Sequence, residues 1–176
     1  MFFKKRNTKV ADYYDQFTES YLETYGYAIQ AFRPENTALL YKYLAKSIGL
    51  KDGLKVLDAG CGVAGPAVAF AKMFAIQIEG LTISKKQQTI AQKYISENNC
   101  NSQIEIKQGD FHHLSKYYNE KFDVIMFLES LGHAQNAKKV INEAAKLLNK
   151  DGVIYIKDFF PFEIENKALK KQHDKV

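Results

Sequence analysis

The stretch that decides the fold runs from residue 56 to residue 65 and reads Val56-Leu57-Asp58-Ala59-Gly60-Cys61-Gly62-Val63-Ala64-Gly65. It begins in a short apolar run, Lys55–Asp58, that predicts a strand ending in an acid. The residues that follow, Pro66–Phe74, predict a helix with proline at its first position. Glycines spaced G-x-G-x-x-G between a strand and a helix allow a tight turn and close approach of the backbone to a ligand. A ligand site is therefore expected at this turn.

Strand-like and helix-like segments alternate from Leu54 onward. Further strands are predicted at Ile76–Thr82, Gln103–Lys107, Phe122–Leu128 and Val153–Lys157, the last after a turn at Asp151–Gly152. Helices are predicted after Ser84, which starts a capping box with Gln87, and around Val140–Leu148. The unbroken apolar run of the fourth strand is typical of a parallel sheet covered on both faces. The pattern predicts a doubly wound α/β sheet whose ligands bind at the carboxyl ends of the strands.

Residues 1–50 predict an N-terminal helical cap, and residues 51–176 form the predicted core. The aromatic residues of the first predicted helix recur at helical spacing, and Gly26 is its expected stop. A second helix is expected from Pro34 to Ile48, before Gly49. The aromatic stripe consists of Tyr14, Phe17, Tyr21 and Tyr25. Two interpretations stay open, packing against the domain or a lid over a ligand.

Composition narrows the class of protein. The chain has 176 residues, enough for one domain, and no apolar run near the roughly 20 residues that span a bilayer. We expect a cytoplasmic protein without stable membrane insertion. The net charge of +5 comes from scattered lysines, and Arg6 and Arg33 are the only arginines, so no nucleic-acid partner is expected. No metal site is predicted, because the adjacent His112 and His113 would diverge on a helix.

Asp58 bears on which ligand the glycine loop holds. The loop alone is compatible with a nicotinamide dinucleotide, a flavin dinucleotide or S-adenosylmethionine. A carboxylate two residues before Gly60 would repel a pyrophosphate, whereas it can bind the ammonium group of S-adenosylmethionine. The residues therefore favour S-adenosylmethionine as the cofactor.

The sequence VLDAGCGVAG closely resembles the first motif of class I S-adenosylmethionine-dependent methyltransferases, and the resemblance extends over about residues 54–158. Gly109-Asp110-Phe111, Phe122-Asp123-Val124-Ile125 and the turn from Leu148 to Val153 resemble later motifs of the family. The resemblance implies a Rossmann-like sheet with strand order 3-2-1-4-5. It also implies that Asp110 binds the adenine amino group and that Tyr14 reaches the methionine carboxylate.

The pattern G-L-T-I-S-x-x-Q from Gly80 to Gln87 is similar to one branch of that family, the cyclopropane fatty-acid synthases and the sterol and geranyl diphosphate C-methyltransferases. Thr82 stands where many members carry an acid for the ribose, and Glu79 comes three residues too early. The resemblance implies that Ile83 packs on the adenine and Gln87 reaches the ribose. The full set of predicted cofactor-binding residues is Tyr14, Asp58, Gly60, Gly62, Thr82, Ile83, Gln87, Asp110, Phe111 and Leu128.

Glu129 and His133 follow the fourth strand and are the predicted catalytic residues. A carboxylate and an imidazole both suit proton transfer, although a helix cap and a loop residue would explain them too. We expect methyl transfer to a small-molecule acceptor, with C-methylation of an isoprenoid or lipid-like substrate ahead of N- or O-methylation. A cofactor-binding module without activity is the remaining alternative. Aromatic side chains are candidates to stabilise a cationic intermediate: Tyr14, Tyr21, Tyr25, Phe159, Phe160 and Phe162.

The class I fold normally has seven strands, and the last two are not recognisable here. After Val153–Lys157 the sequence offers one further helix, Glu163–Lys171. The fifth strand would then be an apolar edge, which invites pairing with another chain. We therefore expect a C-terminally truncated core, or a homo-oligomer or further C-terminal segment that covers this edge.

Overall fold

The computed structural model describes residues 4–30 and 35–159, and its centre is a five-stranded sheet. All strand pairs are parallel and the order is β3-β2-β1-β4-β5. This confirms the predicted class and strand order. The strands are β1 Lys55–Ala59, β2 Gln77–Thr82, β3 Ile104–Gln108, β4 Phe122–Leu128 and β5 Leu148–Lys157.

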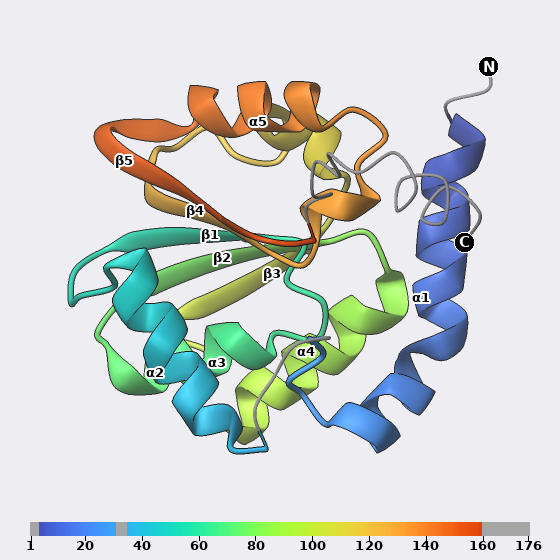
Figure 1. Ribbon diagram of the computed structural model, residues 1–176, viewed down its shortest axis with the longest axis horizontal. Helices are drawn as coiled ribbons and strands as arrows, with labels where there is room; N and C mark the ends of the chain where they lie inside the picture. Colours follow the sequence, from blue (N-terminus) through green and yellow to red (C-terminus); the bar gives the residue numbers. More distant parts are fainter. Residues whose placement is uncertain (1–3, 31–34, 160–176) are drawn as a thin grey trace, which may run out of the picture.

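Helices cover both faces of the sheet. The α-helices are α1 Lys4–Tyr25, α2 Thr37–Ile48, α3 Gly65–Met73, α4 Lys85–Glu97 and α5 Ala137–Lys146, and two short 3-10 helices are η1 Phe111–Lys116 and η2 Leu131–His133. Figure 1 shows α2, α3 and α4 on one face and α5 on the other. Val56 and Leu57 of β1 are both fully buried, yet they belong to separate core clusters because successive strand side chains point to opposite faces. The sheet is thus a buried layer, as its apolar sequence predicts.

The register brings the carboxyl ends of the strands to one edge. Ala59 of β1 lies beside Leu81 of β2, and Asp58 lies beside Met126 of β4. Helix α1 stands beyond this edge, across the ends of the strands (Figure 1). The residues that follow β1, β2, β3 and β4 therefore lie together between the sheet and α1.

Two acidic side chains of α1 contact the start of α4 and hold α1 in place. The carboxylate of Asp15 accepts hydrogen bonds from the Ser84 hydroxyl and from the Lys86 N–H, the latter at 3.1 Å. The carboxylate of Glu19 pairs with the Lys86 ammonium at 3.0 Å. The helix ends at Tyr25, and Gly26 adopts a φ of +58°, which confirms the predicted stop. These contacts fix α1 as a wall over the strand ends.

The starts of α2 and β5 differ from the sequence predictions. Helix α2 begins at Thr37 rather than Pro34, because the Asn36 side chain accepts a hydrogen bond from the Ala38 N–H and caps the helix. The predicted turn at Asp151–Gly152 is wrong. Strand β5 starts at Leu148, opposite Phe122, and residues 149–152 form an irregularity before pairing resumes at Val153. The predicted helix Glu163–Lys171 lies outside the described residues.

Strand β5 borders the described sheet, and Val153 on it is 48% exposed. Across residues 4–30 and 35–159, no helix is both long enough and apolar enough to cross a bilayer. The same residues contain no group of three or more histidine, cysteine or acidic side chains arranged to hold a metal ion.

Candidate active site

All ten predicted cofactor-binding residues and both predicted catalytic residues line one cavity at the carboxyl ends of the strands. Its wall combines the glycine loop after β1 with residues at the ends of β2, β3 and β4. Val10 and Tyr14 of α1 and Tyr27, Ile29 and Gln30 of the following loop form part of its wall. The sequence predictions thus converge on a single site.

The glycine loop after β1 lies against the loop after β4. The N–H groups of Gly60 and Cys61 donate to the Leu81 carbonyl at 2.8 and 3.0 Å. Gly60 has a φ of +100°, and a Cβ there would lie 2.4 Å from the Cβ of Ser130. The Ser130 hydroxyl in turn donates to the Ala59 carbonyl at 2.7 Å. Glycine is required at position 60 for both its backbone conformation and this close approach.

Asp58 is a buried acid that has no ion-pair partner within residues 4–30 and 35–159. Its side chain is in the cavity wall, the residue is 1% exposed, and Oδ2 has no hydrogen-bond partner among the described residues. Burial raises the pKa of Asp58 to about 7. A cationic ligand group at this carboxylate would remove the cost of burying it.

Three buried side-chain atoms in the described part of the chain lack a hydrogen-bond partner, and all three belong to residues that line this cavity. They are Nε2 of Gln30, Oδ2 of Asp58 and Nε2 of His112. Folded proteins rarely leave such atoms unsatisfied, so their gathering in one wall indicates a polar ligand. S-adenosylmethionine fits this set, because it carries a carboxylate, an ammonium group and an adenine amino group. The sequence predicted Asp58 but neither Gln30 nor His112.

Thr82, in the place of the family's ribose acid, positions Gln87. Its hydroxyl donates to Oε1 of Gln87 at 2.8 Å, and Ser84 Oγ caps α4 by accepting the Gln87 N–H at 2.9 Å. The Gln87 side chain therefore turns toward Thr82 instead of completing the predicted capping box. Its Nε2 lies 3.9 Å from the position that a Cβ on Gly62 would occupy. This places an amide nitrogen beside the glycine loop, on the side expected for the ribose.

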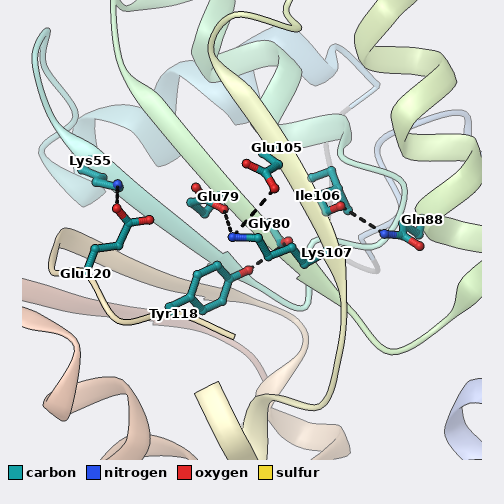
Figure 2. Close-up of polar contacts among 9 residues, drawn as sticks. All are labelled: Lys55, Glu79, Gly80, Gln88, Glu105, Ile106, Lys107, Tyr118 and Glu120. Atoms are coloured by element: carbon teal, nitrogen blue, oxygen red, sulfur yellow. Dashed lines mark hydrogen bonds and ion pairs between the residues drawn. The ribbon is translucent and has the colours of Figure 1, made fainter. Parts of the chain in front are cut away.

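Glu79 lies outside the cavity wall and takes part in a separate polar cluster. Its carboxylate pairs with the Lys107 ammonium at 3.1 Å, and Glu105 lies 3.8 Å from the same nitrogen. The ammonium also lies 4.7 Å from the ring centre of Tyr118, and Figure 2 shows these side chains together. The early position of Glu79 in β2 thus corresponds to a structural role.

The end of β3 presents Asp110, Phe111 and His112. The Asp110 carboxylate accepts hydrogen bonds from the His112 N–H at 2.9 Å and contacts the His112 Nδ1 at 2.6 Å. The Phe111 ring packs edge-on against Phe127, with 6.2 Å between ring centres. Because a carboxylate only accepts, Nδ1 carries the proton in this contact. The adenine-binding role of Asp110 stays a prediction.

Glu129 and His133 each have a partner that the sequence did not predict. Glu129 has a φ of +55°, its N–H donates to the Lys157 carbonyl at 2.6 Å, and its carboxylate pairs with the Lys157 ammonium. His133 contacts the Tyr14 hydroxyl through Nε2 at 2.8 Å. Burial raises the pKa of Tyr14 to about 12, so the hydroxyl is neutral near pH 7. The catalytic roles of Glu129 and His133 stay predictions.

A second cavity adjoins the first and shares part of its wall. Both cavities are lined by Tyr14, Ile29, Gln30, Glu129 and His133. The remaining wall of the second cavity consists of Tyr21, Tyr25, Gly132, Asp158 and Phe159. The second cavity therefore contains four of the six aromatic side chains predicted to stabilise a cation. The other two, Phe160 and Phe162, lie outside the described residues.

Comparison with known proteins assigns the family. Residues 50–175 match the family described as "Methyltransferase domain". The chain belongs to this family. The match confirms the predicted class I fold and the predicted cofactor type, S-adenosylmethionine.

A curated relative from the predicted branch matches the chain, and two solved structures resemble its fold. Over 153 residues, the chain is 33% identical to the sterol 24-C-methyltransferase ERG6A of Gibberella zeae, covering 83% of this chain and 40% of that protein. The chain thus spans less than half the length of this curated relative. The crystal structure of the [4+2]-cyclase SpnF has a TM-score of 0.79 and 26% identity, over 86% of this chain and 60% of that one. A methyltransferase from Thiobacillus denitrificans in complex with S-adenosyl-L-homocysteine shares the fold, with a TM-score of 0.64 and 23% identity over 81% and 56% of the two chains.

Proposed function

We propose that the protein transfers a methyl group from S-adenosylmethionine to a carbon atom of an isoprenoid or lipid-like acceptor. The observation that carries the proposal is a pair of adjoining cavities that share Glu129 and His133. One cavity is lined by the residues whose buried polar atoms lack a hydrogen-bond partner, and the other is lined by aromatic side chains. The likeness to sterol 24-C-methyltransferases supports carbon as the methylated atom.

S-adenosylmethionine supplies an electrophilic methyl group on a sulfonium. When an alkene carbon of the acceptor attacks that group, a carbon–carbon bond forms, the carbon–sulfur bond breaks and the positive charge moves to the acceptor. Tyr14, Tyr21 and Tyr25 line the cavity in which that charge would develop, and aromatic faces stabilise cations. A proton must then leave the acceptor to restore a neutral product.

Glu129 is the proposed proton acceptor or cation stabiliser in this step. It lies in the wall of both cavities, its side chain is 12% exposed, and the backbone and ammonium of Lys157 hold it in place. The pair of His133 and Tyr14 stands in the same shared wall. A positioned carboxylate can act as a general base with little reorganisation.

The test is a transfer assay with S-adenosylmethionine carrying a radioactive methyl group. The acceptor panel contains a sterol with an alkene in its side chain, a linear prenyl diphosphate, an unsaturated phospholipid, and small amines and alcohols. We expect label in an alkene-containing lipid, and loss of that label in Glu129→Gln with S-adenosylhomocysteine binding retained. Labelling of amines or alcohols alone would contradict C-methylation, and binding of the cofactor without any transfer would contradict the proposed activity.

A further inference from the structure

Gln30 is a buried amide held by one end only. It is 6% exposed and lines both cavities. The Lys157 ammonium donates to its Oε1 at 2.8 Å, while its Nε2 is buried without a partner. An ammonium has donors and no acceptor, so the oxygen must face Lys157 and the nitrogen must face away from it. The orientation of the amide is thereby fixed by chemistry.

Lys157 is itself immobilised at the end of β5. Its carbonyl accepts the Glu129 N–H at 2.6 Å, its ammonium pairs with the Glu129 carboxylate, and its side chain is 22% exposed. The Gln30 amide is therefore held from a rigid strand end, although it belongs to the loop after α1. The positive charge on its oxygen side polarises the amide and strengthens the opposite N–H groups as donors.

The unpartnered donor on Gln30 and the unpartnered acceptor on Asp58 lie in the wall of the same cavity. A ligand that satisfies both carries a hydrogen-bond acceptor and a positively charged or hydrogen-bond-donating nitrogen, and the carboxylate and ammonium of an α-amino acid meet both needs. Building on the proposed function, we propose that the Gln30 amide nitrogen donates a hydrogen bond to the methionyl carboxylate of the cofactor. Lys157 acts as a positioning residue that aims this donor.

The test compares two ligands by calorimetry. S-adenosylhomocysteine carries the amino-acid group, whereas 5′-methylthioadenosine has the same nucleoside and sulfur without it. In Gln30→Met we expect the Kd for S-adenosylhomocysteine to rise about tenfold, the usual loss for one hydrogen bond to a charged group. In Gln30→Glu the Kd should rise further, because the new carboxylate repels that of the ligand. Affinity for 5′-methylthioadenosine should stay within about twofold in both variants.

Lys157→Met should weaken S-adenosylhomocysteine in the same selective way. Gln88→Met is the matched control, since the Gln88 amide donates to the Ile106 carbonyl at 3.1 Å outside the cavity wall (Figure 2). Unchanged affinity for S-adenosylhomocysteine in the Gln30 variants, or equal loss for both ligands, would overturn the inference. If the unmodified chain binds neither ligand, the proposed function itself fails. That result differs from failure of the inference alone, in which the unmodified chain binds S-adenosylhomocysteine normally.

Discussion

Replacing Asp58 with asparagine should stabilise the ligand-free protein at alkaline pH while weakening its hold on the cofactor. Burial raises the pKa of this acid from an ordinary 3.8 to about 7. Between these two values the unfolded chain has released the proton and the folded chain still holds it, so folding stability falls as the pH rises. At about 1.4 kcal/mol per pH unit, the full cost above pH 7 is on the order of 4 kcal/mol.

The measurement is urea unfolding of the parent and of Asp58→Asn at pH 5 and pH 8. Over this interval the unfolding free energy of the parent should fall by about 3 kcal/mol more than that of the variant. The reason is that only the unfolded parent is ionised at Asp58 from pH 5 to about 7, which costs about 1.4 kcal/mol for each of roughly two pH units. Comparing the two pH values within each protein cancels the constant cost of burying the new amide. Parallel pH dependences in the two proteins would refute the reasoning, since they would mean that Asp58 is already ionised at pH 5 in the folded chain.

Ligand binding should reverse this pH effect. A cationic group beside Asp58 favours the carboxylate, so affinity for S-adenosylhomocysteine should fall by up to about tenfold for each pH unit below 7 in the parent. Asp58→Asn should bind weakly at every pH in this range. If the affinity of the parent does not change from pH 5.5 to 8, Asp58 does not bind the ammonium group of the ligand.

Two further predictions concern the cavity wall. In Gly65→Ala the new Cβ would lie 1.8 Å from the Tyr27 carbonyl oxygen, so the loop after α1 must move, at a cost of about 1–3 kcal/mol in unfolding free energy and a loss of S-adenosylhomocysteine affinity. Gly49→Ala, where the site is open but φ is +80°, should cost about 1–2 kcal/mol and leave affinity unchanged. Tyr14→Phe should lower the unfolding free energy by about 1 kcal/mol by removing the contact with His133. Tyr13→Phe, which loses an exposed contact with Tyr21 on the same helix, should cost less than half as much. Equal losses of unfolding free energy in the two variants would mean that the Tyr14–His133 contact between α1 and η2 does not stabilise the fold.

Sequence predicted those parts of the site that single strand ends determine. Asp58, Gly60 and Thr82 sit where a strand finishes and the backbone must turn, and glycine spacing and apolar runs mark such places directly. The order of the strands followed from the family resemblance, and the structure confirms it. The strand-end residues, unlike the strand order, depend on neighbours within a few positions along the chain.

Contacts between distant segments were not predictable in the same way. Gln30 meets Lys157 across 127 positions, and Tyr14 meets His133 across 119. Neither glutamine nor lysine carries a local signal, because both are ordinary surface residues until the fold brings them together. The prediction of a turn at Asp151–Gly152 was wrong because it considered only the local sequence. That dipeptide favours a turn locally, but it lies within β5, in the stretch 149–152 between the pairs Phe122–Leu148 and Val124–Val153.

The shared wall explains how a small domain can align two dissimilar ligands. The Lys157 ammonium pairs with the Glu129 carboxylate and donates a hydrogen bond to the Gln30 amide oxygen. Glu129 and Gln30 both line the first cavity and the second, aromatic cavity. A change at the end of β5 is therefore transmitted to the proposed base and to the proposed carboxylate donor together. Methyl transfer requires the acceptor carbon and the sulfonium methyl to be held in line, and it is sensitive to small displacements. Lys157, through one ammonium group, fixes the relative position of the residues proposed to hold each side of that line.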